Sequence, residues 1–150
     1  MTTSDPLRMT FDVACPAGHA FSVWTARIST WWPRDHTISG NAPQIVLQPS
    51  VGGRIYERAA DGTEHEWGEV TAWQPPARLG YLWYLGREPA DATEVEIRFT
   101  AQGAGKTRIE ITHRGWERLG QAAGPWRDRN QAAWQSLLPH YLTAIAEGGT

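Results

Sequence analysis

The chain is 150 residues long, the size of one domain, and 41% of its residues are apolar and 20% charged, which is typical of a folded globular protein. Fourteen Lys and Arg residues against sixteen Asp and Glu residues give a formal net charge of −2, so the positive surplus typical of nucleic-acid-binding proteins is absent. No apolar run approaches the roughly 20 residues that a membrane-spanning helix needs.

The first predicted elements are a strand and two short helices. Apolar and polar residues alternate from Arg8 to Ala14, which predicts a half-buried strand. Pro16 suits the first turn of a helix, and apolar residues then recur at helical spacing to about Ile28. A second short helical turn is expected before Pro33, which ends it.

From residue 44 the apolar pattern changes to a period of two, which predicts strands. The turn signals between them, such as Asp61-Gly62, are short, and short connections favour antiparallel neighbours. With the first strand, the chain is therefore expected to form a sheet of seven antiparallel strands. The six later ones cover residues 44–48, 54–58, 64–73, 78–85, 94–100 and 107–113.

The C-terminal segment is predicted to be one long amphipathic helix. Apolar residues recur at spacings of three and four from Trp126 to Ile145. Pro139 lies inside this pattern and predicts a kink near residues 135–138, and Gly148-Gly149 is expected to end the helix. One long helix against a curved antiparallel sheet is an α+β arrangement.

The order of these elements is that of the helix-grip fold, and local motifs agree with it. The motifs are Val13-Ala14-Cys15-Pro16-Ala17 with Phe21 and Trp24, Trp31-Trp32-Pro33, Gly52-Gly53, Gly68-Glu69-Val70, Pro75-Pro76-Ala77-Arg78-Leu79 with Trp83, Gly105-Lys106-Thr107, His113-Arg114-Gly115-Trp116, and Gly124 with Trp126 and Trp134. In this order and spacing they resemble the START-like (SRPBCC) superfamily. Within it they are most similar to the branch named after the activator of heat-shock-protein-90 ATPase. The resemblance covers about residues 9–146 of a single domain spanning 1–150.

The resemblance implies a cavity between the sheet and the long helix that holds a small apolar or amphipathic ligand. Some relatives in the superfamily catalyse cyclisation, dehydration or hydrolysis there, whereas many bacterial members of this branch have no assigned activity. The chain resembles a stand-alone domain, without the additional N-terminal domain of the eukaryotic co-chaperones. The branch name does not by itself establish a chaperone role.

The sequence offers no pattern typical of a metal or cofactor site. The five histidines lack paired metal-ligand spacing, and alternation along a strand points His65 away from Glu64 and Glu66. Phosphate-binding loops and dinucleotide fingerprints are absent, so we expect no metal and no cofactor. Cys15 is the only cysteine and residues 1–8 do not resemble a signal peptide, so we expect a cytoplasmic protein.

Three residues are candidates for acid–base chemistry. His113 continues the apolar phase of its strand and is expected to point inward. There it either acts as an acid, base or ligand partner or is a core histidine whose partner is a backbone carbonyl or the neighbourhood of Trp116. Glu57 and Glu69 lie on central strands. Each either projects inward as a carboxyl with a raised pKa or lies on the solvated face, paired with arginine.

The nine tryptophans suggest a large aromatic core or an aromatic cavity. Asn130 lies on the apolar phase of the long helix and is expected either to contact a ligand or to tie the helix to a strand. The cavity is expected to measure about a few hundred Å³, the usual size of a small-molecule pocket. The candidate ligand-binding residues are Tyr81, Trp83, Phe99, Ile111, Trp126, Asn130 and Trp134.

The face occupied by Trp67 and Trp73 is left open by the sequence. Simple alternation places both on the face of Glu69 and Thr71, but a bulge near Gly68 would exchange the faces. If the two indoles point inward they enlarge the cavity. If they point outward they form an apolar patch that would mark a homodimer or another protein partner.

Three functions follow as hypotheses. The first is binding of a small hydrophobic or aromatic ligand without catalysis. The second is a cyclase or hydrolase that uses His113 with Glu57 or Glu69. The third is a co-chaperone-like protein-interaction module that uses exposed aromatic residues.

Overall fold

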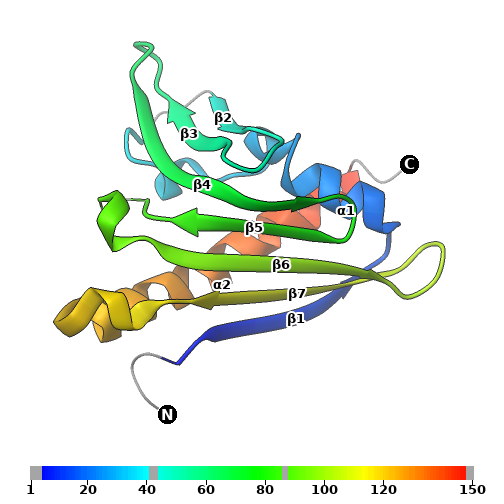
Figure 1. Cartoon of the computed structure of the whole chain (residues 1–150). Helices are drawn as coiled ribbons and strands as arrows, with labels where there is room; N and C mark the ends of the chain where they lie inside the picture. Colours follow the sequence, from blue (N-terminus) through cyan, green and yellow to red (C-terminus); the bar gives the residue numbers. More distant parts are fainter. Residues whose placement is uncertain (1–4, 41–43, 86–87, 148–150) are drawn as a thin grey trace.

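In the computed structural model, which describes residues 5–40, 44–85 and 88–147, a seven-stranded antiparallel sheet curves around a long helix (Figure 1). Its strand order is β1-β7-β6-β5-β4-β3-β2, so the first strand pairs with the last and the others follow the chain as a meander. This confirms the predicted α+β helix-grip fold. The strands are β1 (Leu7–Val13), β2 (Gln44–Leu47), β3 (Arg54–Arg58), β4 (Glu64–Gln74), β5 (Arg78–Trp83), β6 (Thr93–Ala101) and β7 (Thr107–Arg114).

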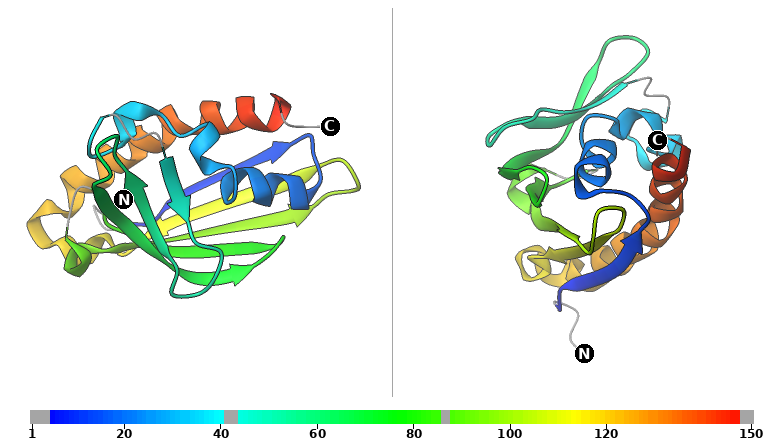
Figure 2. Two further views of the ribbon diagram at one scale, coloured as in Figure 1. Left: turned by 90° about the horizontal axis from the view of Figure 1, so that it is seen from above. Right: turned by 90° about the vertical axis from the view of Figure 1, so that its right-hand side faces the viewer.

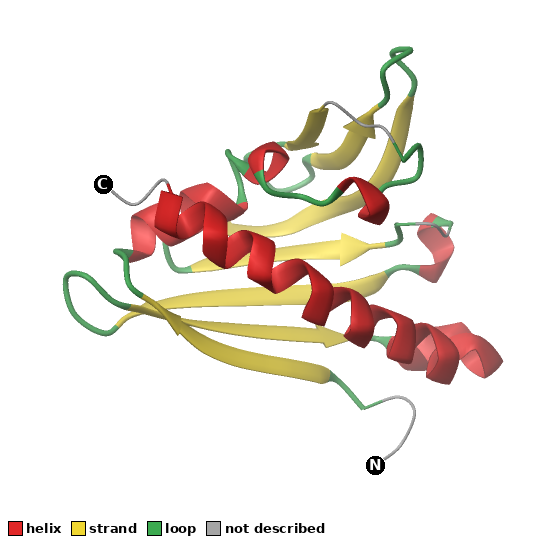
Figure 3. Cartoon of the chain, turned by 180° about the vertical axis from the view of Figure 1, so that it is seen from behind, coloured by secondary structure: helices red, strands yellow, loops and turns green. Residues whose placement is uncertain are grey.

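Helix α1 (Ala17–Trp24) and helix α2 (Ala123–Glu147) cover the concave side of this sheet (Figure 2). Seen from behind, α2 runs obliquely across the strands (Figure 3). Short 3₁₀ turns connect these elements: η1 (Ile28–Thr30), η2 (Arg34–His36), η3 (Pro89–Asp91) and η4 (Trp116–Ala122).

Alternation decides which face of the central strands enters the core. In β6, Val95, Ile97 and Phe99 are buried, whereas the residues between them lie on the outer face. There, Glu94 lies directly opposite Arg114 and accepts a hydrogen bond from its Nε at 3.0 Å. The outer face of the sheet is therefore solvated and carries paired charged side chains. The apolar core lies between the sheet and the two helices.

Helix α2 covers the predicted C-terminal segment and contains Pro139. It begins at Ala123, three residues before Trp126, and follows the unpredicted 3₁₀ segment η4. The α-helix continues through Pro139 to Glu147 without a break. Both Pro139 and Gln135, whose carbonyl would have bonded to residue 139, are exposed, so water can satisfy that carbonyl. The predicted stop at Gly148-Gly149 lies outside the described residues.

Strand β4 contains two irregularities that reset its alternation. The pairing with β3 shifts between Ile55 and Tyr56, and the pairing with β5 shifts between Val70 and Ala72. At the first irregularity the chains approach closely: a Cβ added to Gly68 would lie 2.0 Å from the carbonyl oxygen of Leu82. Glycine is therefore required there, as is usual where another backbone comes this near a strand.

Candidate functional site

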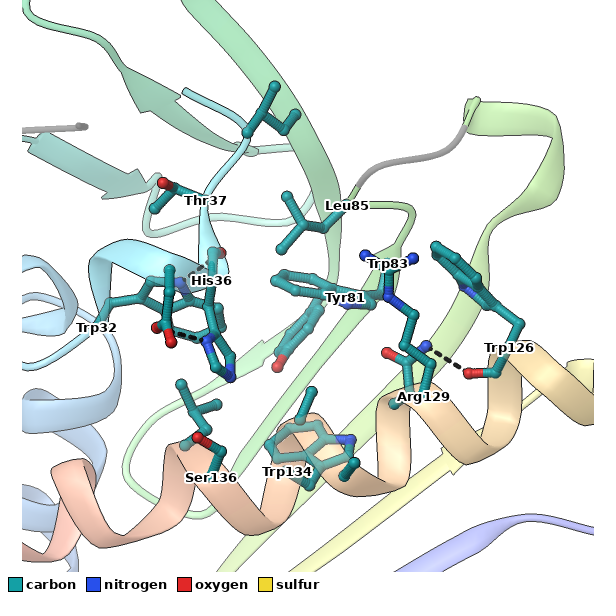
Figure 4. Close-up of a pocket in the computed structure, with 16 residues that line it drawn as sticks. Trp32, His36, Thr37, Tyr81, Trp83, Leu85, Trp126, Arg129, Trp134 and Ser136 are labelled. Atoms are coloured by element: carbon teal, nitrogen blue, oxygen red, sulfur yellow. Dashed lines mark hydrogen bonds and ion pairs between the residues drawn. The ribbon is translucent and has the colours of Figure 1, made fainter. Parts of the chain in front are cut away.

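A pocket of about 550 Å³ lies between α2, strand β5 and the irregular segment that contains η2 (Figure 4). Its volume falls in the range typical of small-molecule sites. Four tryptophans and a tyrosine line it, together with smaller apolar side chains and several polar ones. The lining residues are Trp32, Asp35, His36, Thr37, Ile38, Tyr81, Trp83, Leu85, Trp126, Arg129, Asn130, Ala132, Ala133, Trp134, Ser136 and Leu137.

Five of the seven predicted ligand-binding residues line this pocket. Tyr81 and Trp83 project from β5, and Trp126, Asn130 and Trp134 project from α2. The side chains of Tyr81 and Trp83 face those of Trp126 and Trp134 across the pocket (Figure 4).

The other two predicted residues, Phe99 and Ile111, lie in the core and do not line the pocket. The ring of Phe21, from α1, packs edge-on against Phe99 with 5.3 Å between the ring centres. Ile111 is opposite Ile97 and Met9 in the sheet and is 1% exposed. Helix α1 thus fills the space over this end of the sheet and confines the pocket to the opposite end.

Trp32 contributes a part of the aromatic wall that was not among the predicted binding residues. Its ring centre lies 5.8 Å from that of Trp83 and 5.1 Å from that of Trp67. Trp67 is fully buried behind these two rings. Sequence periodicity could not reveal Trp32, because it lies in an irregular segment; the only signal was the Trp31-Trp32-Pro33 motif.

The irregularities in β4 determine whether Trp67, Trp73 and Glu69 face the core or the solvent. Both indoles face the core, Trp73 at 5.1 Å from the ring of Phe21, while Glu69 and Thr71 are exposed. The expectation that the four side chains share one face is wrong, because each irregularity exchanges the faces of the residues that follow it. An exposed surface of Trp67 and Trp73 is therefore not formed, and Glu69 does not project inward.

Glu57 is fully buried and holds the irregular segment against the sheet. Its carboxylate accepts hydrogen bonds from the backbone N–H groups of Ile38 (2.6 Å) and Ser39 (3.0 Å), the Ser39 hydroxyl (2.7 Å) and Nε1 of Trp67 (2.8 Å). Burial raises the pKa of Glu57, but these donors outweigh burial and hold the pKa below its ordinary value. Of the two alternatives for Glu57, the structure shows the inward one, but with a lowered pKa in place of the expected raised one and without an arginine partner among the described residues. The carboxylate acts as an anchor for the pocket wall.

His113 is fully buried and has both ring nitrogens engaged. Nε2 lies 2.6 Å from Oγ1 of Thr93, and Nδ1 lies 3.0 Å from Nε1 of Trp134. Burial lowers the pKa of His113 to about 3. Within the part of the chain that the structure describes, the ring nitrogens have no carboxylate hydrogen-bond partner, so the anticipated pairs with Glu57 or Glu69 are not formed. His113 points inward as predicted and is a core histidine, with side-chain partners.

The opposite end of the pocket is formed by the first turns of α2. The guanidinium of Arg129 lies over the indole of Trp126, 4.8 Å from its ring centre. Asn130 donates a hydrogen bond from Nδ2 to the backbone carbonyl of Trp126 at 2.9 Å. The amide therefore bonds within the helix and not to a strand, and its remaining edge is at the pocket.

A second, shallower hollow of about 590 Å³ lies on the other side of α1. It is lined by Gly18, Phe21, Ser22, Thr25, Ala26, Leu47, Pro49, Trp73, Pro75 and Pro76. None of these side chains is charged, and the polar side chains among them are Ser22 and Thr25, of which Thr25 donates its hydroxyl to the carbonyl of Phe21. We therefore take the first pocket as the candidate site.

The described residues contain neither a candidate metal site nor a candidate membrane-spanning helix. Among residues 5–40, 44–85 and 88–147, no three His, Cys, Asp or Glu side chains gather in a way that could hold a metal ion. None of the helices within those ranges is long and apolar enough to cross a membrane.

A curved antiparallel sheet closed by a long helix, with an aromatic pocket between them, defines a helix-grip protein of the START-like (SRPBCC) superfamily. Within that class, the sequence model described as "Activator of Hsp90 ATPase homolog 1-like protein" matches residues 14–147. The chain therefore belongs to this family, as its motifs indicated.

Solved structures of similar proteins cover almost the whole chain. A self-sacrificing resistance protein, CalC from Micromonospora echinospora, is 26% identical with a TM-score of 0.76, and the match covers 99% of each chain. An anthrahydroquino-gamma-pyrone synthase, Txn09, is 35% identical with a TM-score of 0.59 over 82% of this chain and 85% of that one. An HSP90 activator from Plasmodium falciparum has a TM-score of 0.70 over 95% and 96% of the chains, but at 18% identity it shows the fold alone.

The curated relatives that match by sequence are much longer proteins. The UDP-N-acetylmuramate–L-alanine ligase of Nostoc punctiforme is 26% identical over 102 residues, which are 68% of this chain and 21% of the ligase. The ligase of Trichodesmium erythraeum is also 26% identical, over 75% of this chain and 20% of its own length. The chain thus spans about a fifth of the curated relatives that it matches.

Proposed function

We propose that this protein binds a small, flat, largely apolar aromatic ligand in the pocket between β5 and α2. The observation that carries the proposal is the aromatic wall of a pocket of about 550 Å³, in which Trp32, Trp83, Trp126 and Trp134 present their rings. Aromatic walls with a few placed polar groups are typical of sites that hold planar organic molecules.

The distribution of charge in the site agrees with such a ligand. Within the lining, the charged side chains are Asp35 and Arg129. Asp35 is hydrogen-bonded to His36, which lies at the opposite end of the pocket from Arg129 (Figure 4). A ligand with an apolar centre and polar edges matches this arrangement better than an ion or a fully apolar chain does.

The relatives support the same class of ligand. The pyrone synthase, at 35% identity, is named for a polycyclic aromatic product. For the present chain we propose binding without catalysis, because the acid–base pair anticipated at His113 is not formed and Glu57 is committed to four hydrogen bonds.

The test is a fluorescence titration of the purified protein with 2-methoxyanthraquinone, an apolar planar probe. Because four tryptophans line the pocket, binding is expected to quench their emission saturably at one probe per chain and to raise the melting temperature. Native mass spectrometry should show the same one-to-one complex. Linear, unsaturable quenching without thermal stabilisation would contradict the proposal.

A further inference from the structure

The segment at one end of the pocket carries a histidine with a defined tautomer. Nδ1 of His36 lies 2.9 Å from Oδ1 of its neighbour Asp35. A carboxylate can only accept a hydrogen bond, so Nδ1 carries the proton and donates it. In the neutral imidazole the other ring nitrogen, Nε2, is then an acceptor.

This acceptor has no donor within the described structure. Nε2 of His36 is buried without a hydrogen-bond partner, and the side chain as a whole is 16% exposed. A buried acceptor without a donor costs free energy that a suitably placed hydroxyl would recover. The carboxylate of Asp35 is 81% exposed, so the hydrogen-bonded pair has room to turn toward an arriving ligand.

The backbone around His36 is fixed on both sides. Nε1 of Trp32 donates to the carbonyl oxygen of His36 at 3.0 Å, and the N–H of Ile38 is bound to Glu57 at 2.6 Å. The backbone that carries the imidazole is therefore held at one place in the wall, across the pocket from Trp126 and Arg129 (Figure 4), and only the side chain turns. An acceptor on a fixed backbone has a limited reach and can select among ligands, whereas one on a loose loop would adapt to any of them.

Neighbouring polar groups of the lining are already engaged. Thr37 donates from its hydroxyl to the carbonyl of Arg34 at 2.6 Å and accepts from the N–H of Gly40 at 3.0 Å. The N–H of the Trp134 indole is bound to His113. Nε2 of His36 is thus a buried acceptor of the pocket lining that has no donor among the described residues.

We infer that His36, oriented by Asp35, is a specificity-determining residue that accepts a hydrogen bond from a hydroxyl of the ligand. The ligand class is then narrower than planar aromatic molecules in general: it is a phenol or an enol whose hydroxyl lies at an edge of the ring system. This inference rests on the proposed function of the pocket, since it adds a polar requirement to an aromatic site.

The experiment compares 2-hydroxyanthraquinone with 2-methoxyanthraquinone, which has the same ring system but no donor at that position. One net hydrogen bond corresponds to a roughly two- to tenfold difference in dissociation constant. The native protein is expected to prefer the hydroxyl probe by this factor. His36→Phe should abolish the preference, and His36→Gln, which keeps an acceptor oxygen, should restore part of it.

The matched control is His140→Phe, because His140 is exposed on α2 and does not line the pocket. It should keep the preference of the native protein, and circular dichroism should show that all three variants are folded. Equal binding of both probes by the native protein, or a preference that survives His36→Phe, would overturn the inference while the binding function stands. Binding of neither probe would overturn both.

Discussion

Nε1 of Trp134 donates a hydrogen bond to Nδ1 of His113 across 3.0 Å, and this contact joins the pocket wall to strand β7 of the sheet. Because Nδ1 is the acceptor, the proton of the neutral imidazole lies on Nε2, which donates it to Oγ1 of Thr93. The indole of Trp134 also stacks on Trp24 at 6.0 Å between ring centres. His113 therefore sits behind the pocket wall and has no nitrogen free for a ligand.

Replacing Trp134 with Phe should destabilise the protein mainly through this hydrogen bond. The phenyl ring keeps much of the apolar contact, but Nδ1 of His113 remains buried without a donor, which costs about 1–3 kcal/mol. Equilibrium denaturation with urea measures the loss. Trp83→Phe is the control, because the indole N–H of Trp83 makes no hydrogen bond within the described residues. Equal losses in the two variants would show that the Trp134–His113 bond contributes nothing.

His113 should make stability depend on pH in a defined window. Burial lowers the pKa of His113 from 6.5 to about 3. At pH values between these two, the unfolded chain therefore binds a proton at His113 and the folded chain does not. The stabilising effect is complete above pH 6.5 and is lost as the pH falls, by up to about 1.4 kcal/mol per pH unit. Denaturation measured between pH 6 and pH 5 isolates His113, because carboxylates such as Glu57, with pKa values below 4.5, respond at lower pH. His113→Gln should flatten the slope in this window, and an unchanged slope would contradict the prediction.

Glu57→Gln should weaken both the fold and the pocket. The amide presents N–H groups to donors that now bind a carboxylate, so the expected loss of stability is about 1.5–3 kcal/mol, the usual value of hydrogen bonds to a charged group. The wall at Thr37 and Ile38 should loosen, and affinity for 2-methoxyanthraquinone should fall. Glu69→Gln is the matched control, because Glu69 is exposed on the outer face and should change stability by less than about 0.5 kcal/mol. A similar stability and probe affinity in the two variants would show that Glu57 does not anchor the pocket wall.

Filling the pocket should abolish binding without unfolding the protein. Ala133 lies on α2 in the lining, and Ala133→Leu places three additional carbon atoms where the ligand would lie. Ala146→Leu makes the same change at an exposed position of the same helix, outside the lining. Fluorescence titration should show at least a tenfold weaker affinity for 2-methoxyanthraquinone in the first variant and native affinity in the second. If both variants bind as the native protein does, the probe occupies another place.

The sequence by itself determined the elements and their arrangement. Alternation in segments such as Glu94–Thr100 and helical spacing from Trp126 to Ile145 are local patterns, set by which residues must be buried together. They fixed the seven strands, the long helix and the helix-grip fold. They also placed His113 on the inner face and offered that face as one of two alternatives for Glu57. They identified the side of the sheet and of α2 from which Tyr81, Trp83, Trp126, Asn130 and Trp134 line the pocket.

Only the tertiary structure decided what those inward residues do. The irregularities in β4 depend on a close approach between Gly68 and Leu82, which no periodicity within β4 contains, and they separate Trp67 from Glu69. Trp32 and His36 reach the pocket because Glu57, 19 residues beyond Ile38, anchors an irregular segment. Trp134, 21 residues beyond His113, occupies one of the histidine's nitrogens. Hydrogen bonds between distant residues are fixed only when the sheet and helix pack. Here they give His113 and Glu57, two candidates for acid–base chemistry, structural roles.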